Sequence, residues 1–215
     1  MDIVDPRIET YMRSLLARYD EPVLLEMEDE GERRGFPIIG RLVGVTVELL
    51  ARSVKARRVF ELGSGFGYSA YWFSRAVGRE GEVHCTDGDP GNEPKALQAL
   101  GRAGLDGPIR WHVGDAVTAL NVVEGSFDVV YNDIDKQGYP DAWRAARDRI
   151  RPGGLYLCDN VLWDGSVADP DGDHGRSRET TDAVIEHNRL VSEDDRFVSS
   201  IVPTRDGLFA ALRVA

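Results

Sequence analysis

From residue 57 onward, short apolar runs alternate with amphipathic segments, and this alternation constrains the fold more than any other feature of the chain. Runs rich in β-branched and aromatic residues indicate strands, and apolar residues at helical spacing indicate helices. Alternating strands and helices are typical of a doubly wound α/β sheet with helices on both faces. Strands are predicted over 57–62, 82–87, 108–113, 126–133, 153–160, 197–203 and 207–214, and helices over 6–19, 22–34, 39–54, 68–77, 92–104, 115–120, 138–150 and 179–193.

The two final strands are expected to be antiparallel, because only the short segment TRDG at 204–207 separates them and suits a hairpin turn. No internal repeat or linker divides the chain. A length of 215 residues suits one domain with a substantial core. We therefore predict a single domain over 1–215, with helices in the N-terminal region 1–54.

Charge and composition restrict the possible partners. The chain carries a formal net charge of -11, so a phosphate backbone is repelled and nucleic acid is not expected as a partner. No apolar run approaches membrane-spanning length, and the N-terminus lacks the pattern of a secretory signal, so a cytoplasmic protein without a membrane partner is expected. Cys85 and Cys158 lie within predicted strands and are expected to be core residues.

A glycine-rich loop, ELGSGFGYSA, follows the first predicted strand. Gly63, Gly65 and Gly67 allow a tight turn and a close approach of the backbone to a ligand. The spacing is not that of a dinucleotide-binding motif, because Tyr68 occupies the place of its third glycine. Simple turn formation remains the structural alternative.

Acidic residues near this loop suggest the kind of ligand. Glu61 lies inside the end of the strand, where a carboxylate needs a cationic or hydrogen-bonding partner. Asp87 ends the second strand, where an acid commonly binds the hydroxyls of a ribose. Free N–H groups near Tyr68 and Ser69, at the start of the next helix, are suited to a carboxylate. S-adenosylmethionine combines a carboxylate, a positive centre and a ribose.

The segment GDA follows the third predicted strand. Asp115 either accepts a hydrogen bond from an adenine amine or caps the next helix, and Ala116 would lie beside the same ligand. Asp89 is interpreted as a residue of the loop or of the helix start.

Two further strands end in oxygen-bearing side chains, Asp133 after one and Asp159 with Asn160 after the other. Neighbouring strands lie roughly 4.8 Å apart, so these side chains can reach one hard cation. An all-oxygen set favours Mg, Mn or Ca over zinc. Lys136 lies one short loop beyond Asp133 and is a candidate base. Turn capping by Asp159 and Asn160, and a solvated charge at Lys136, are the alternatives.

The segment 163–178, WDGSVADPDGDHGRSR, is rich in glycine and aspartate and leaves the end of the second of these strands. We interpret it as a mobile flap over the site, with an ordinary surface loop as the alternative.

Taken together, these motifs resemble the cation-dependent small-molecule O-methyltransferases, a class I family that includes catechol and caffeoyl-coenzyme A O-methyltransferases. The resemblance covers about residues 36–215. It is carried by ELGSGFGYSA, by Asp87, by DIDK at 133–136, by DNVLWDGSV at 159–167 and by the terminal RDGLFAALR. The family's sheet has the strand order 3-2-1-4-5-7-6 with strand 7 antiparallel, and seven strands are predicted in this sequence.

The resemblance assigns roles to individual residues. It implies a metal site at Asp133, Asp159 and Asn160, a general base at Lys136, and an aromatic near the acceptor at Trp163. The predicted cofactor contacts, from the resemblance and the loop chemistry together, are Glu61, Gly63, Gly65, Gly67, Ser69, Asp87, Asp115, Ala116 and Asp133.

The expected reaction is methyl transfer from S-adenosylmethionine to a hydroxyl of a small catechol-like or hydroxylated aromatic acceptor, with a divalent cation, Mg before Mn or Ca. The family also suggests a homodimer, and a contribution of the N-terminal helices of 1–54 to the acceptor pocket. A nicotinamide-dependent oxidoreductase is a weaker hypothesis, because the glycine motif is incomplete. A non-catalytic methyltransferase-like binding module is weaker too, since it has no need of the carboxylates, the amide and the lysine together.

Overall fold

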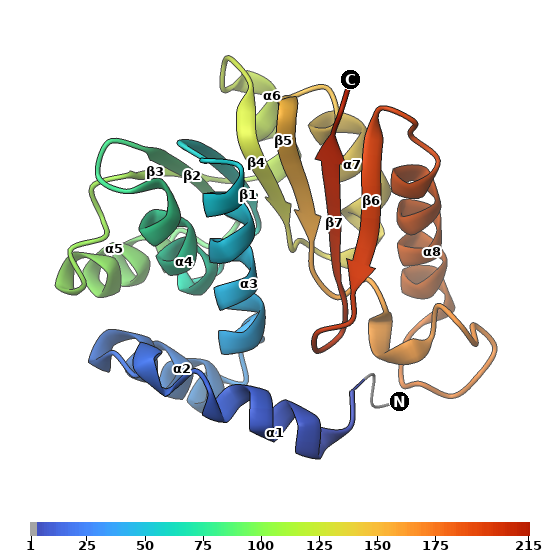
Figure 1. Cartoon of the computed structure of the whole chain (residues 1–215), viewed down its shortest axis with the longest axis horizontal. Helices are drawn as coiled ribbons and strands as arrows, with labels where there is room; N and C mark the ends of the chain where they lie inside the picture. Colours follow the sequence, from blue (N-terminus) through green and yellow to red (C-terminus); the bar gives the residue numbers. More distant parts are fainter. Residues whose placement is uncertain (1–3) are drawn as a thin grey trace.

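The computed structural model describes residues 4–215, which build one seven-stranded sheet in the order β3-β2-β1-β4-β5-β7-β6 (Figure 1). Neighbouring strands from β3 to β5 are parallel, and β7 is antiparallel to both β5 and β6. The predicted order and the antiparallel hairpin are confirmed. The strands are β1 Arg58–Leu62, β2 Glu82–Asp87, β3 Ile109–Val113, β4 Phe127–Asn132, β5 Ile150–Cys158, β6 Phe197–Val202 and β7 Leu208–Arg213.

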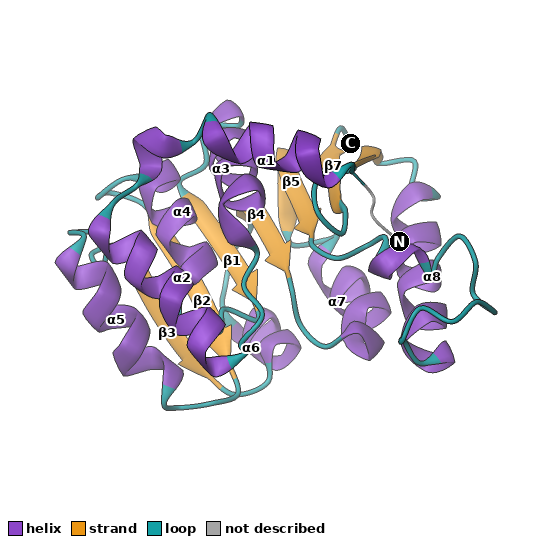
Figure 2. Ribbon diagram, turned by 90° about the horizontal axis from the view of Figure 1, so that it is seen from below, coloured by secondary structure: helices purple, strands orange, loops and turns teal. Residues whose placement is uncertain are grey.

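Helices cover both faces of the sheet (Figure 2). The α-helices are α1 Pro6–Ser14, α2 Pro22–Arg34, α3 Gly40–Ser53, α4 Tyr68–Val77, α5 Asn92–Arg102, α6 Ala116–Val122, α7 Tyr139–Ala146 and α8 Arg178–Ser192. Single 3-10 turns occur at η1 Ala17–Tyr19, η2 Lys136–Gly138 and η3 Trp163–Gly165.

Two hydrophobic clusters fill the space between the sheet and the two helical layers. One joins α2, α3, α4 and α5 to the sheet and contains Cys85, and the other joins α6, α7 and α8 to the opposite face and contains Cys158. Both cysteines are buried and free, as predicted for core residues. The burial of both faces explains why the central strands are almost wholly apolar in sequence.

The N-terminal helices deviate from the predicted pattern. The helix predicted over 6–19 ends at Ser14, and the chain then forms the separate turn η1. In Figure 1, α1 and α2 lie across the end of the sheet at which the parallel strands finish. The segment that links α2 to α3, residues 36–39, therefore borders the cavity at that end.

The helix predicted over 138–150 is also too long, since α7 ends at Ala146 and β5 already begins at Ile150. The register between β4 and β5 shifts near the start of the two strands, which accommodates the proline and glycines of 152–154. Gly154 is required there, because an added Cβ would lie 2.8 Å from the backbone oxygen of Asp128.

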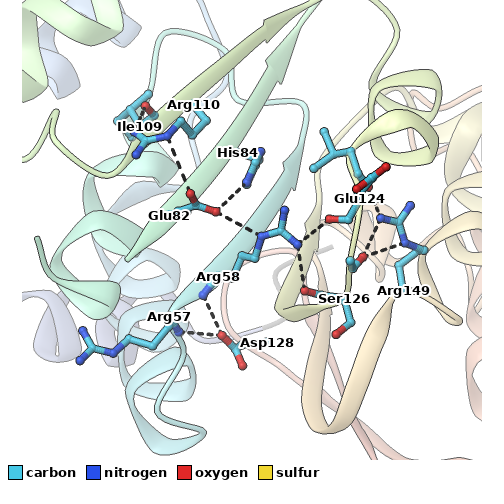
Figure 3. A network of polar contacts seen from close by, with 12 residues as sticks. Arg57, Arg58, Glu82, His84, Ile109, Arg110, Glu124, Ser126, Asp128 and Arg149 are labelled. Carbon is cyan, nitrogen blue, oxygen red and sulfur yellow. Dashed lines mark hydrogen bonds and ion pairs between the residues drawn. The ribbon is translucent and has the colours of Figure 1, made fainter. Parts of the chain in front are cut away.

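A polar network joins the amino ends of β1, β2 and β4, opposite the cavity (Figure 3). The backbone N–H of Arg57 and the backbone N–H of Arg58 each donate to Asp128 Oδ2 at 2.7 Å. The Arg58 side chain donates to Glu82 Oε2 at 3.2 Å and to the Glu124 carbonyl at 2.7 Å. Asp128 also pairs with Arg151. This network therefore stabilises the sheet and has no direct part in the site.

Replacement of Asp128 by alanine is expected to lower the free energy of unfolding by about 2–4 kcal/mol, because two N–H groups and a guanidinium lose their partner. The Asp128 side chain is only 15% exposed. Urea denaturation of Asp128→Ala measures the loss. Asp171→Ala is a matched control, since this side chain is 89% exposed and its surface pair with Arg178 should contribute little to stability. Equal stability of the two variants would contradict a structural role for Asp128.

Candidate functional site

A cavity of about 1140 Å³ opens at the carboxyl ends of β1, β2, β4 and β5. In doubly wound sheets, ligands bind where the strand order reverses, which here is between β1 and β4. The volume of the cavity slightly exceeds the usual range for one small-molecule ligand, so a cofactor and an acceptor can share the cavity. The walls are formed by residues 36–39, 63–69, 86–88, 114–116, 133–138, 159–160, 163–164, 176, 180 and 205–206, although not by every residue of each segment.

The glycine loop runs along the floor of this cavity. Gly63, Gly65 and Gly67 all have positive φ, at 83°, 53° and 91°. A Cβ at Gly63 would lie 2.6 Å from the carbonyl oxygen of Asp133, so only glycine allows β1 and β4 to end this close together. The loop thus has a structural purpose in addition to lining the cavity.

Glu61 lies beneath the loop and is fully buried. Its Oε2 accepts a hydrogen bond from Ser64 Oγ at 2.7 Å, whereas Oε1 has no partner among residues 4–215. Burial raises the pKa of Glu61 to about 7, although the hydroxyls of Ser69 and Ser64 oppose this shift. An unpaired, buried carboxylate oxygen at this place is suited to a ligand that brings a positive charge or an N–H group.

Asp87 ends β2 at the rim of the cavity. Its Oδ1 accepts hydrogen bonds from the Asp89 backbone at 2.8 Å and from Asn92 Nδ2 at 3.0 Å. These bonds orient the carboxylate, and no residue in the described part of the chain donates to Oδ2. Asp89 Oδ1 accepts from the Gly91 N–H, so Asp89 belongs to the loop, as predicted.

Asp115 lies next to Ala116 in the cavity wall and is the N-cap of α6, where it accepts from the Thr118 N–H at 2.7 Å. The capping interpretation is confirmed, whereas a contact with adenine stays a prediction.

Asp133, Asp159 and Asn160 meet at the ends of the adjacent strands β4 and β5. The Lys136 ammonium lies 3.2 Å from Asp133 Oδ1 and 2.9 Å from Asn160 Oδ1, so side chains from both strands already surround one positive group. Asp159 is 2% exposed and its Oδ1 has no partner within residues 4–215.

The electrostatics of this group fit a bound cation. Burial raises the pKa of Asp159 to about 7, and the charge of Asp133 adds to the shift while Arg205 opposes it. Burial also raises the pKa of Asp133, and Lys136 opposes that shift. Within residues 4–215, no group of three or more His, Cys, Asp or Glu side chains is placed to hold a metal. The amide of Asn160 would therefore have to be the third protein ligand, and an all-oxygen set of this kind suits a hard divalent cation.

Lys136 is held in place by more than its charge. Its Nζ also lies 2.7 Å from Tyr139 Oη, and that hydroxyl donates to the Asp159 carbonyl at 2.8 Å. The Lys136 side chain is 11% exposed. Lys136 is therefore a fixed group at the centre of the site and not a solvated loop charge.

Trp163 forms one wall beside this group. The Arg176 guanidinium lies 4.0 Å from the centre of its ring, and Trp163 Nε1 donates to Thr180 Oγ1 at 3.2 Å. Both ends of the predicted flap, Trp163 with Asp164 and Arg176, line the cavity. The flap thus borders the site, and its mobility stays a prediction.

Several residues in or directly behind the cavity wall were not predicted from the sequence. Tyr139 lies one residue beyond η2, and its aromatic ring resembles any core residue of α7 in the sequence. Phe36 and Ile38 come from a segment that is distant in the chain, and Arg205 occupies the predicted hairpin turn. A charged residue in the middle of a turn was the one signal available for Arg205.

The strand order, the antiparallel β7 and the glycine loop at the switch point define a methyltransferase-type α/β fold. The chain belongs to the O-methyltransferase family, whose profile matches residues 18–214. It is 33% identical to a catechol O-methyltransferase of Niastella koreensis over 75% of this chain and 76% of the relative. It is 25% identical to caffeoyl-CoA O-methyltransferase 2 of Populus trichocarpa over 98% and 83% of the two chains.

Solved structures agree with this membership. The O-methyltransferase TomG of Streptomyces achromogenes, solved in complex with SAM and involved in tomaymycin synthesis, superposes with a TM-score of 0.85 at 25% identity, covering 97% of this chain and 96% of TomG. A methyltransferase from Geobacter sulfurreducens gives a TM-score of 0.83 at 26% identity over 100% of both chains. Across residues 4–215, none of the helices is long and apolar enough to cross a membrane.

Proposed function

We propose that this protein transfers a methyl group from S-adenosylmethionine to a hydroxyl of a small catechol-like or hydroxylated aromatic acceptor and requires a divalent cation, with Mg²⁺ favoured over Mn²⁺ and Ca²⁺. The observation that carries the proposal is the convergence of Asp133, Asp159, Asn160 and Lys136 beside the glycine loop in one cavity. The names of the catechol O-methyltransferase relative and of the SAM complex of TomG support it.

The cofactor would occupy the glycine-loop half of the cavity. Asp87, with Oδ2 free of protein donors, is placed to bind the ribose hydroxyls, and the unpaired Glu61 Oε1 provides an acceptor beneath the loop. The complete proposed set of contacts is Glu61, Gly63, Gly65, Gly67, Ser69, Asp87, Asp115, Ala116 and Asp133, and all of these except Glu61 and Gly67 line the cavity.

The other half of the cavity would hold the acceptor. Asp133, Asp159 and Asn160 would bind the cation, which when bound lowers the pKa of a coordinated hydroxyl. Lys136 Nζ accepts the hydroxyl proton when Lys136 is in its neutral amine form and so becomes an ammonium beside Asp133, while Tyr139 Oη holds Nζ in position. The acceptor oxygen forms a bond to the methyl carbon as the bond from that carbon to sulfur breaks, and the sulfonium becomes a neutral thioether. The chain contributes mainly by aligning these groups, with Trp163 as a wall.

Organisation of the whole protein is part of the same proposal. Residues 1–215 would act as one domain, and the N-terminal helical region, 1–54, would contribute to the acceptor pocket through the segment 36–39 between α2 and α3. A cytoplasmic homodimer that acts on small molecules is the proposed state.

The proposal is tested by incubation of the protein with labelled S-adenosylmethionine, MgCl₂ and a panel of catechols. We expect methylated products that disappear when a chelator is added and return with excess Mg²⁺. Reduction of a nicotinamide cofactor in place of methyl transfer would support the oxidoreductase alternative. Cofactor binding without any product would support a non-catalytic binding module.

Replacement of Asp87 by alanine is expected to weaken S-adenosylhomocysteine binding by about 1.5–3 kcal/mol, the contribution of hydrogen bonds to a charged group. Isothermal titration calorimetry measures the change. Asp89→Ala is the matched control, because this neighbouring acid bonds only within its own loop and does not line the cavity. Unchanged affinity in Asp87→Ala would mean that the ribose is held elsewhere.

A further inference from the structure

Arg205 lies at the tip of the β6–β7 hairpin and lines the cavity. The turn is closed by a hydrogen bond from the Gly207 N–H to the Thr204 carbonyl at 3.0 Å. Within it, Arg205 has a φ of 51°, a conformation that is favourable for glycine and unfavourable for an arginine. A strained backbone that carries a long side chain into a cavity points to a use for that side chain.

The guanidinium of Arg205 is fixed across the cavity. Nη1 donates to the Ile38 carbonyl at 2.7 Å, a contact between residues 167 positions apart in the chain. The guanidinium of Arg205 also packs against Gly40, where an added Cβ would lie 3.1 Å from Nη1. A neutral carbonyl partner orients the guanidinium without neutralising its charge, and most of its five N–H donors remain available.

The charge of Arg205 is not balanced by a direct ion pair. The other cations of the cavity have carboxylate partners, since Lys136 pairs with Asp133 and Arg176 pairs with Asp164. In the described part of the chain, no carboxylate lies within ion-pair distance of Arg205. This leaves a half-buried guanidinium that faces the cavity without a direct ion pair, within electrostatic range of Asp133 and Asp159.

The hairpin places this charge on the acceptor side. The Leu162 N–H donates to the Asp206 carbonyl at 2.9 Å, and the Asp164 N–H donates to Asp206 Oδ1 at 2.7 Å. Arg205 is thereby attached to the segment that contains Trp163 and that follows the proposed metal ligands. The glycine loop, which contributes several of the proposed cofactor contacts, follows β1, and β4 and β5 separate β1 from β7 in the sheet.

We propose that Arg205 binds a carboxylate on the acceptor, so that the preferred acceptors are aromatic diols carrying one carboxylate. This inference rests on the proposed function. The planar fork of a guanidinium matches a carboxylate with two parallel hydrogen bonds. The many aspartates of the wall and the net charge of -11 repel a single negative charge less than they repel a multiply charged acceptor such as a coenzyme A thioester.

The test compares protocatechuate with its neutral amide, which keeps the same diol, in the wild-type protein and in Arg205→Gly and Arg205→Lys. Glycine suits the positive φ of this turn, so Arg205→Gly should fold normally. We expect KM for protocatechuate to rise about tenfold in Arg205→Gly, because a charge-assisted pair is lost. KM for the amide should stay unchanged. Arg205→Lys should restore part of the difference, and kcat should change little in both variants.

Arg110→Gln is the matched control, because it removes one positive charge from the outer strand β3, away from the cavity. It should leave the preference for the acid unchanged. An equal loss for acid and amide in Arg205→Gly would overturn the proposal and show that Arg205 only ties the hairpin to residue 38. A wild-type protein without preference for the acid would overturn it as well.

Calorimetry with both compounds in the presence of S-adenosylhomocysteine separates this inference from the proposed function. Tighter binding of the acid that depends on Arg205 would support anion recognition even if no methyl transfer were found. Methylation of the diols without such a difference would overturn the role of Arg205 and leave the proposed function intact.

Discussion

Replacement of Asp159 by alanine should lower the rate of methyl transfer by about 10³-fold or more, because it removes a charged ligand of the proposed cation, whose contribution to the transition state is several kcal/mol. The side chain is buried and its Oδ1 has no partner within residues 4–215. Binding of S-adenosylhomocysteine should largely survive, since it depends mainly on the glycine loop and Asp87. Steady-state rates and calorimetry measure the two effects, and a chelator should reproduce the loss in the wild-type protein.

Thermal unfolding distinguishes loss of the cation from misfolding. Added Mg²⁺ should raise the melting temperature of the wild-type protein and have no effect on Asp159→Ala. Without Mg²⁺, the variant should be at least as stable as the wild-type protein, because burying an unpaired carboxylate is unfavourable. Asp141→Ala, at a surface residue whose side chain is 78% exposed, serves as control for both measurements. Full activity of the wild-type protein in excess chelator would rule out the metal hypothesis.

Replacement of Lys136 by methionine is expected to reduce the rate by about 10²–10⁴-fold, the range for a positioned acid–base group. Methionine has a similar length but cannot accept a proton. The deficit should become smaller as the pH rises, because the acceptor hydroxyl then ionises without help. The measurement is a pH–rate profile with a catechol acceptor at saturating Mg²⁺.

Binding measurements complete this experiment. Lys136→Met should bind S-adenosylhomocysteine as the wild-type protein does. Lys95→Met replaces an exposed lysine on α5 and should have a wild-type rate at every pH. A rate for Lys136→Met equal to that of the wild-type protein at pH 7, or a deficit that does not depend on pH, would mean that Lys136 is not the base.

Much of the fold and the central part of the site could be predicted from the sequence because they depend on local rules. Alternation of strands and helices specifies a doubly wound sheet, and parallel strands bring their carboxyl ends to one edge. Asp133 and Asp159 each follow a buried strand, so their proximity was predictable once β4 and β5 were taken as neighbours. The complete strand order was predictable only through the resemblance to a known family, since periodicity does not specify which strands pair.

Interactions between distant segments could not be predicted in this way. The bulge near the start of β5 depends on the contact between Gly154 and Asp128, and the early end of α7 follows from the start of that strand. The role of Tyr139 in holding Lys136 requires its hydroxyl to meet the carbonyl of Asp159, which lies just beyond the end of β5. Such contacts depend on three-dimensional packing, for which a single sequence carries no periodic signal.

Sequence alone thus determined the class of fold, the glycine loop and the oxygen-bearing side chains at two strand ends, because spacing along one strand or loop sets their geometry. Only the tertiary structure showed which oxygens of Glu61 and Asp159 lack partners, and that Arg205 spans the cavity to Ile38. The physical reason is that burial and the balance of charge are properties of all the segments around a group. They exist only after those segments have packed together.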